Sequence, residues 1–124
     1  MELVIGGAYQ GKLTWSVRQK GFSQGDLFDL SEGFPSCAHP CFYHLEVLTR
    51  RACADGLDAE AILEKLSAHI ENSVVISREI GCGIVPADPK DSTWREECGR
   101  TLCEIARMSE RFERIVCGCG IRIK

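Results

Sequence analysis

A glycine-rich turn directly after a short apolar run is the feature that most constrains the fold of this chain. The run Leu3-Val4-Ile5 leads into residues 6–12, Gly-Gly-Ala-Tyr-Gln-Gly-Lys, which have the Gly-x4-Gly-Lys spacing of a phosphate-binding loop. In such a loop a strand ends, and backbone N–H groups converge on an anion at the start of a helix. Glycines let the main chain approach the phosphate oxygens, and Lys12 reaches the outer phosphates. The candidate phosphate-binding residues are Gly6, Gly7, Ala8, Tyr9, Gln10, Gly11, Lys12, Leu13 and Thr14.

The loop departs from the full pattern at Leu13. That position normally carries a Ser or Thr whose hydroxyl binds Mg²⁺. Thr14 does not simply replace it, because one residue along a helix rotates the side chain by about 100°. We therefore expect phosphate binding, with the metal ion positioned weakly or by another group. The alternative is a glycine-rich turn between a strand and a helix that carries a surface lysine.

Composition excludes several classes of protein. A length of 124 residues predicts one domain, residues 1–124, with one core. The net charge of −3 argues against a nucleic-acid partner or a membrane surface. The chain has no apolar stretch as long as a membrane span and does not begin with a signal-peptide pattern, so we expect a cytoplasmic protein.

The eight cysteines are many for this length, and we expect them to be reduced thiols. One group could offer soft ligands to zinc and gives a hypothesis of a zinc- or redox-responsive module: Cys37, His39, Cys41 and His44. No second pair of ligands has a matching spacing. A second group is expected to be buried as small hydrophobes: Cys98, Cys103, Cys117 and Cys119.

Hydrophobic periodicity predicts strands that alternate with helices. Strands are expected at residues 2–5, 41–43, 74–77 and 114–118, with an edge piece at 121–124. Helices are expected at residues 13–20, 45–54 and 59–70, and a last one opens on the capping box Thr93-x-x-Glu96 and reaches Phe112. Residues 21–41 are expected to be mostly loop, with one short element at 26–30, and residues 81–89 a loop without helix. This order predicts an α/β fold of three layers, like that of P-loop NTPases, with a small and mostly parallel sheet.

A parallel sheet would bring three segments to one edge: the glycine-rich loop, Arg78-Glu79, and residues 118–120. Glu79 could bind Mg²⁺ directly or through water, or orient a nucleophile; the alternative is a salt bridge to Arg78 or a nearby helix. His44 could be a general base or a covalent nucleophile; the alternative is a hydrogen-bonded core residue. The candidate catalytic residues are therefore Lys12, Glu79 and His44.

Four blocks of sequence together resemble one enzyme family. They are residues 2–12; residues 74–86, which contain Glu-Ile-Gly-Cys-Gly-Ile-Val-Pro; residues 94–100; and residues 118–124. In order and character they are similar to the adenosylcobinamide kinase/adenosylcobinamide-phosphate guanylyltransferase family of cobalamin assembly. The Glu-Ile-Gly-x-Gly-Ile-Val-Pro string is the most distinctive of them. The blocks cover roughly half of the chain.

The resemblance implies transfer of the γ-phosphoryl of GTP or ATP, with Mg²⁺, to the aminopropanol hydroxyl of adenosylcobinamide. Members also form a guanylylated histidine and assemble as homo-oligomers, commonly trimers. By position, Gly6, Gly7, Gly11 and Lys12 would hold the triphosphate, and Glu79 would lie near the metal ion or the substrate hydroxyl. The segment before Val74 is shorter than in full-length members, so we expect the kinase half rather than the guanylyltransferase half. The alternative is a non-catalytic nucleotide-binding sensor or scaffold in cobalamin metabolism.

Overall fold

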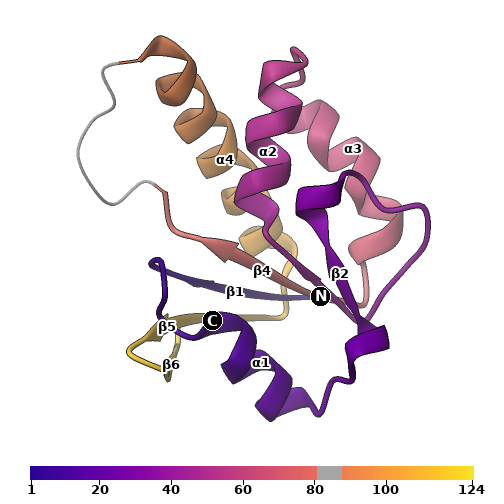
Figure 1. The fold of residues 1–124 in the computed structure, drawn as a ribbon, viewed down its shortest axis with the longest axis vertical. Helices are drawn as coiled ribbons and strands as arrows, with labels where there is room; N and C mark the ends of the chain where they lie inside the picture. Colours follow the sequence, from indigo (N-terminus) through magenta and orange to yellow (C-terminus); the bar gives the residue numbers. More distant parts are fainter. Residues whose placement is uncertain (81–87) are drawn as a thin grey trace.

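The computed structural model describes residues 1–80 and 88–124, and these residues form a six-stranded sheet in the order β2-β3-β4-β1-β5-β6 (Figure 1). The predicted loop at 81–89 lies mostly outside the described residues. The strands are β1 (Glu2–Gly6), β2 (Leu27–Asp29), β3 (Cys41–Tyr43), β4 (Val74–Arg78), β5 (Arg111–Val116) and β6 (Cys119–Arg122). All pairings are parallel except that of β5 with β6, which is antiparallel. This confirms the predicted α/β class with a mostly parallel sheet.

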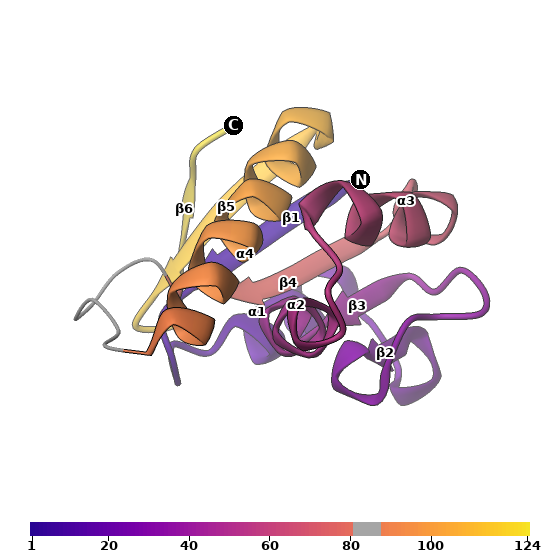
Figure 2. The same cartoon turned by 90° about the horizontal axis from the view of Figure 1, so that it is seen from above.

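The helices cover both faces of the sheet (Figures 1 and 2). They are α1 (Lys12–Lys20), α2 (Leu45–Ala54), α3 (Ala59–Ile70) and α4 (Pro89–Met108), with 3₁₀ turns at Gln24–Asp26 and Leu30–Glu32. Figure 2 shows α2, α3 and α4 over one face of the sheet, and α1 lies beyond the other. The arrangement is therefore three-layered, as the sequence predicted.

The core follows from the two-residue period of the strands. In β1, Leu3 packs into the cluster shared with α2, α3 and α4, whereas its neighbour Val4 packs into a second cluster on the α1 side. In β4, Val75 and Ile76 divide in the same way. Successive side chains of a strand point to opposite faces, so strands that are apolar at every position become buried on both sides.

The longest helix begins earlier and ends earlier than the sequence predicted. Pro89 occupies its first turn and Asp88 is its N-cap, so the predicted helix start at Thr93 and the helix-free loop through Pro89 were both wrong. Proline is favoured at the first helical position, because its missing N–H has no partner there in any case. The Thr93 hydroxyl instead donates to the Pro89 carbonyl at 3.0 Å. The predicted helix end at Phe112 was also wrong, because Phe112 lies in β5.

Residues 21–41 contain more structure than predicted. The expected short element is β2, flanked by the two 3₁₀ turns, and it pairs in parallel with β3. Its end is fixed by Asp29, whose carboxylate accepts the backbone N–H of Ser31 at 2.9 Å. A three-residue strand leaves too little periodicity to be recognised from sequence.

Of the four cysteines expected to be buried, only Cys98 is buried. Cys103, Cys117 and Cys119 are exposed, so that prediction was wrong for them. Cys103 points outward from α4, and the other two flank the turn between β5 and β6. Within residues 1–80 and 88–124, no helix combines the length and apolarity that crossing a bilayer would need.

Candidate active site

The glycine-rich loop joins β1 to α1 in the strand–loop–helix arrangement that phosphate binding requires. Gly6 ends the strand, and a Cβ there would lie 2.7 Å from the Ile115 carbonyl oxygen of β5, so glycine is needed at this close approach. Tyr9 and Gly11 both adopt positive φ, 56° and 84°. These left-handed residues reverse the chain and deliver it into α1, where Gly11 is the N-cap.

The turn between β5 and β6 holds the loop in place. The Gly118 N–H donates to the Gln10 carbonyl at 2.9 Å, and the Cys117 N–H donates to the Gln10 side-chain oxygen at 2.6 Å. On the other side, the Glu79 N–H donates to the Gly6 carbonyl at 2.8 Å. The three segments that the sequence predicted at one edge therefore do meet there.

Lys12 lies across the loop. Its Nζ donates to the Gly7 carbonyl at 2.8 Å. Burial lowers the pKa of this ammonium, while the nearby carboxylate of Glu46 acts in the opposite direction. The Lys12 ammonium is partly desolvated and is hydrogen-bonded to a neutral carbonyl. A phosphate anion that replaces this carbonyl would therefore stabilise the charged ammonium.

Leu13 and Thr14 begin α1. Leu13 packs against the core cluster on the α1 side, so its position is apolar in the structure as well as in the sequence. Thr14 is exposed at the edge of the same site.

A cavity of about 370 Å³ opens above the loop at the carboxyl ends of β1, β3 and β4. It is lined by Ala8, Tyr9, Gly11, Lys12, Leu13, Thr14, Tyr43, His44, Glu46, Ile76, Ser77 and Arg78. In a parallel sheet this edge is where ligands bind. Lys12 and His44, predicted from different parts of the sequence, share this cavity.

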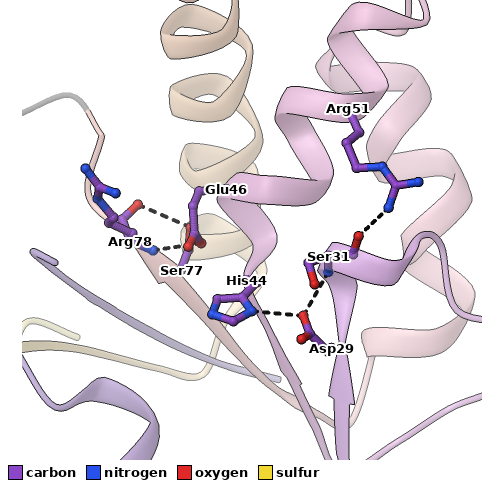
Figure 3. Close-up of polar contacts among 7 residues, drawn as sticks. All are labelled: Asp29, Ser31, His44, Glu46, Arg51, Ser77 and Arg78. Atoms are coloured by element: carbon purple, nitrogen blue, oxygen red, sulfur yellow. Dashed lines mark hydrogen bonds and ion pairs between the residues drawn. The ribbon is translucent and has the colours of Figure 1, made fainter. Parts of the chain in front are cut away.

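His44 forms a dyad with Asp29 (Figure 3). The ring Nδ1 lies 2.9 Å from Asp29 Oδ1. Burial works to raise the pKa of Asp29, but hydrogen bonds from Ser31 and His44 outweigh it and lower that pKa below its usual value. The ionised carboxylate only accepts, so Nδ1 carries the hydrogen, and in the neutral ring the lone pair is then on Nε2. His44 is exposed and lines the cavity, so it is not the core residue of the alternative interpretation.

Glu46 is a buried acid in the first turn of α2, and it also lines the cavity. Its Oε2 accepts the Arg78 backbone N–H at 3.0 Å and lies 3.4 Å from the Ser77 hydroxyl, which donates to it. Figure 3 shows the carboxylate turned toward the end of β4. Glu46 therefore ties α2 to the strand next to the P-loop strand.

Glu79 is engaged elsewhere. Its carboxylate lies 3.1 Å from Arg114 Nε on β5, so an ion pair is present, with a different partner from the one the sequence suggested. Glu79 is not among the described residues that line the cavity.

The suggested zinc ligands do not gather at one point. Cys37 Sγ lies 3.4 Å from His39 Nε2, but Cys41 is fully buried in the core, and burial raises its pKa to about 12. His44 is bound to Asp29 instead. Among the residues that the structure describes, no three His, Cys, Asp or Glu side chains are placed to hold a metal ion together.

Sequence reasoning missed Asp29 and Glu46. Asp29 stands among scattered polar residues, and Glu46 falls inside an amphipathic helix where an acid normally faces solvent. Their positions relative to the strand ends could have identified them. Asp29 ends a strand, and Glu46 comes two residues after the histidine that follows β3.

The oxygen donors of the cavity suit a magnesium ion. Glu46 offers a carboxylate, and Thr14 and Ser77 offer hydroxyls. Mg²⁺ prefers such hard ligands and is usually bound by one or two carboxylates together with substrate phosphates.

The fold and the site together define an α/β protein of the P-loop type, with its cavity at the carboxyl edge of a parallel sheet. The model of the family described as cobinamide kinase / cobinamide phosphate guanyltransferase matches residues 46–123, more than half of the chain. The chain belongs to this family, which acts in cobalamin biosynthesis. The glycine-rich loop and His44 precede the matched residues, so their assignment depends on sequence and geometry. No curated protein matches the chain.

Proposed function

We propose that this protein binds GTP or ATP at residues 6–14 and transfers the γ-phosphoryl group to the aminopropanol hydroxyl of adenosylcobinamide. One observation carries the proposal: the P-loop lysine and an oriented histidine line one cavity at the carboxyl edge of the sheet. Membership of the cobinamide kinase family supports the choice of substrates.

Each candidate residue has a role in this reaction. The substrate oxygen attacks the γ-phosphorus, the bond to the leaving nucleoside diphosphate breaks, and charge spreads over the transferred oxygens. Lys12 and the loop amides stabilise that charge. His44 Nε2 accepts the hydroxyl proton, and Asp29 holds the ring in the correct tautomer. Mg²⁺ would neutralise phosphate charge when bound, and Glu79, at the same edge of the sheet, would exchange its ion pair with Arg114 for the metal ion or the substrate hydroxyl.

Transfer of labelled phosphate from γ-labelled GTP and ATP to adenosylcobinamide tests the proposal. Lys12→Ala should abolish transfer. Lys20→Ala is the matched control: Lys20 lies on the same helix but pairs with Glu2 at 2.7 Å, and transfer should persist. Equal activity of both variants would contradict the proposed site.

A second candidate function is a nucleotide-binding sensor or scaffold without turnover. The packing of Leu13 against the core, where a metal-binding hydroxyl is usual, favours it. It predicts nucleotide binding with no phosphate transfer at any Mg²⁺ concentration, so the same assay separates the two functions.

Guanylyl transfer is not part of the primary proposal. His39 lies between Phe28 and Phe42, with ring centroids 5.1 Å and 5.8 Å away, and only His44 lines the cavity among the described histidines. GTP labelled at its α-phosphorus would reveal any guanylylated histidine.

We further expect a cytoplasmic homo-oligomer, trimeric as in the family. Light scattering would check the number of subunits.

A further inference from the structure

We infer that the guanidinium of Arg78 binds the γ-phosphate of the nucleotide and, together with Lys12, makes the site select a nucleoside triphosphate over a diphosphate. The inference rests on the proposed function, because it concerns the phosphate group that the proposed reaction transfers. The sequence suggested for Arg78 only an ion pair with Glu79, and in the structure Glu79 pairs with Arg114 instead.

The strand order places Arg78 between the two groups that the reaction requires. β4 lies between β3, which His44 follows, and β1, which leads into the glycine-rich loop. Arg78 is the last residue of β4, and its Cα is paired with that of Gly6, the first residue of the loop. The transferred phosphoryl group must lie between the nucleotide and the base that accepts the hydroxyl proton. The end of β4 therefore lies beside that position.

The Arg78 side chain is available to a ligand. It is exposed, although the four residues before it in β4 are buried. Its backbone N–H donates to Glu46 Oε2 at 3.0 Å, whereas its guanidinium has no hydrogen bond or ion pair within residues 1–80 and 88–124. Figure 3 shows the guanidinium extending away from the Glu46 carboxylate. Arg78 is thus held through its main chain, and its side-chain donors are left for a ligand.

The charges that line the cavity favour an anion. Lys12 and Arg78 are positive and Glu46 is negative, so with His44 neutral it is Arg78 that makes the lining net positive. The two cations are close enough for the Arg78 charge to act on Lys12. Like charges in a partly desolvated cavity repel each other, and an anion between them removes the repulsion. A γ-phosphate has oxygens for both cations, and a guanidinium can bind two of them at once.

A solvated surface arginine without a role is the rival explanation, because Arg78 is exposed. Arg78→Ala and Arg78→Lys separate the two explanations. Both variants keep the backbone N–H that donates to Glu46, so the tie between β4 and α2 survives. Arg78→Lys also keeps the charge but loses the fork that binds two oxygens. Arg18→Ala is the matched control, since Arg18 is exposed on α1 and does not line the cavity.

The experiment measures, by calorimetry in EDTA, the affinities for imido analogues of GTP and ATP and for GDP and ADP. Salt at about 0.15 M screens exposed charges that lie more than about 8 Å from the ligand. The wild-type protein should prefer the triphosphates. In Arg78→Ala this preference should fall by about tenfold or more, with the diphosphate affinities unchanged. Arg78→Lys should be intermediate, and Arg18→Ala should keep the wild-type preference.

A second readout depends on how near Arg78 lies to Lys12. Burial is the largest cause of the lowered pKa of Lys12; Glu46 opposes it, Arg78 adds to it, and Glu79 opposes it. Arg78→Ala should therefore raise the pKa of Lys12 in the protein without nucleotide. Proton uptake on nucleotide binding should then begin at a higher pH than in the wild-type protein. Arg18→Ala should leave this pH unchanged.

The outcomes are distinguishable. Loss of the triphosphate preference in Arg78→Ala, together with the shift in proton uptake, would support the inference. The inference would be overturned, with the nucleotide site left standing, by any of four results in the variants: a preference that persists in Arg78→Ala, an equal loss of diphosphate and triphosphate affinity, the same loss in Arg18→Ala, or an unshifted proton uptake. Failure of the wild-type protein to bind any of these nucleotides would overturn the proposed function as well. Thermal unfolding of each variant confirms that the protein is folded.

Discussion

At the scale of single residues, the site is a set of charges placed against one another in a partly desolvated cavity. Lys12 is held by a carbonyl of its own loop, and His44 is held by Asp29. Each of these contacts orients a side chain and leaves it able to bind or react. The Lys12 ammonium can exchange the carbonyl for a phosphate, and the neutral imidazole of His44 has one nitrogen that can still accept a proton.

Nucleotide binding should be coupled to proton uptake by Lys12. In the protein without nucleotide, burial lowers the pKa of Lys12 below the ordinary lysine value of 10.5. A bound triphosphate would raise this pKa again. Between the two pKa values, binding takes up a proton, and affinity falls as pH rises through the pKa of the free protein. Calorimetry at a series of pH values up to 10.5, in buffers of different ionisation enthalpy, measures this uptake. Lys12→Arg should show none, because a guanidinium does not titrate there.

Asp29→Asn should reduce both activity and stability in a pH-dependent way. The folded-state pKa of Asp29 lies below 3.8, so its contribution to stability is present above that pH and is lost as pH falls through the folded-state pKa. At pH 7 the free energy of unfolding of the variant should be lower than that of the wild-type protein by about 1 kcal/mol or less. This difference between the two proteins should become smaller toward pH 3. Urea unfolding at both pH values measures it. A constant difference across pH would show that the Asp29 charge contributes nothing.

At the scale of elements, the sequence predicted most strands and helices but not all of their limits. β1 and β4 were recognisable because strands buried on both faces are continuously apolar. The start of α4 was missed because Asp88-Pro89 is a strong N-terminal signal that was interpreted as loop. β2 was recognised only as a short element, because its place in the sheet depends on pairing with β3 and not on its own pattern.

The packing of α1 on the β5–β6 hairpin gives a test at this scale. A Cβ at Gly120 would lie 2.6 Å from Trp15 Cζ2 and 2.7 Å from Glu113 Oε2, so Gly120→Ala must displace the hairpin or the indole. We expect a loss of about 1–3 kcal/mol in the free energy of unfolding. Because this hairpin also holds Gln10, nucleotide affinity should fall as well.

Gly99→Ala is the control for that substitution. Gly99 lies inside α4, and a Cβ there meets nothing within 4 Å. The variant should gain about 0.5–1 kcal/mol from helix propensity and bind nucleotide as the wild-type protein does. Equal stability changes in the two variants would contradict the packing described for Gly120.

At the scale of the whole molecule, the site is assembled from segments far apart in the chain. The loop after β1, Asp29 at the end of β2, His44 after β3, and Glu46 on α2 meet because parallel strands direct their carboxyl ends to one edge. The sequence predicted that edge and identified Lys12 and His44 on it. It could not pair His44 with Asp29 or turn Glu46 inward, since those contacts depend on the strand order and on how α2 packs against β4.

The alkylation rates of two buried cysteines would show whether the helices on the two faces of the sheet separate from it together. Cys41 lies in the core on the α1 side, and Cys98 on α4 lies near Thr49 of α2; burial raises their pKa values to about 12 and about 11. At pH 8 only about one in 10⁴ and one in 10³ of these thiols would be ionised, so both should resist alkylation in the native protein. Cys103 and Cys119, which are exposed, should react readily.

Peptide mapping after timed alkylation measures each site separately, with the urea-unfolded protein as the control in which every cysteine reacts. Because the two buried cysteines lie on opposite sides of the sheet, equal slow rates would mean that the layers open only in global unfolding. Faster labelling of Cys98 would mean that α4 separates first from the rest of the fold. Labelling of Cys41 as fast as Cys103 would contradict its burial. Nucleotide with Mg²⁺ should slow both buried sites by the same factor if opening is global, because a ligand that binds only the folded state stabilises the molecule as a whole.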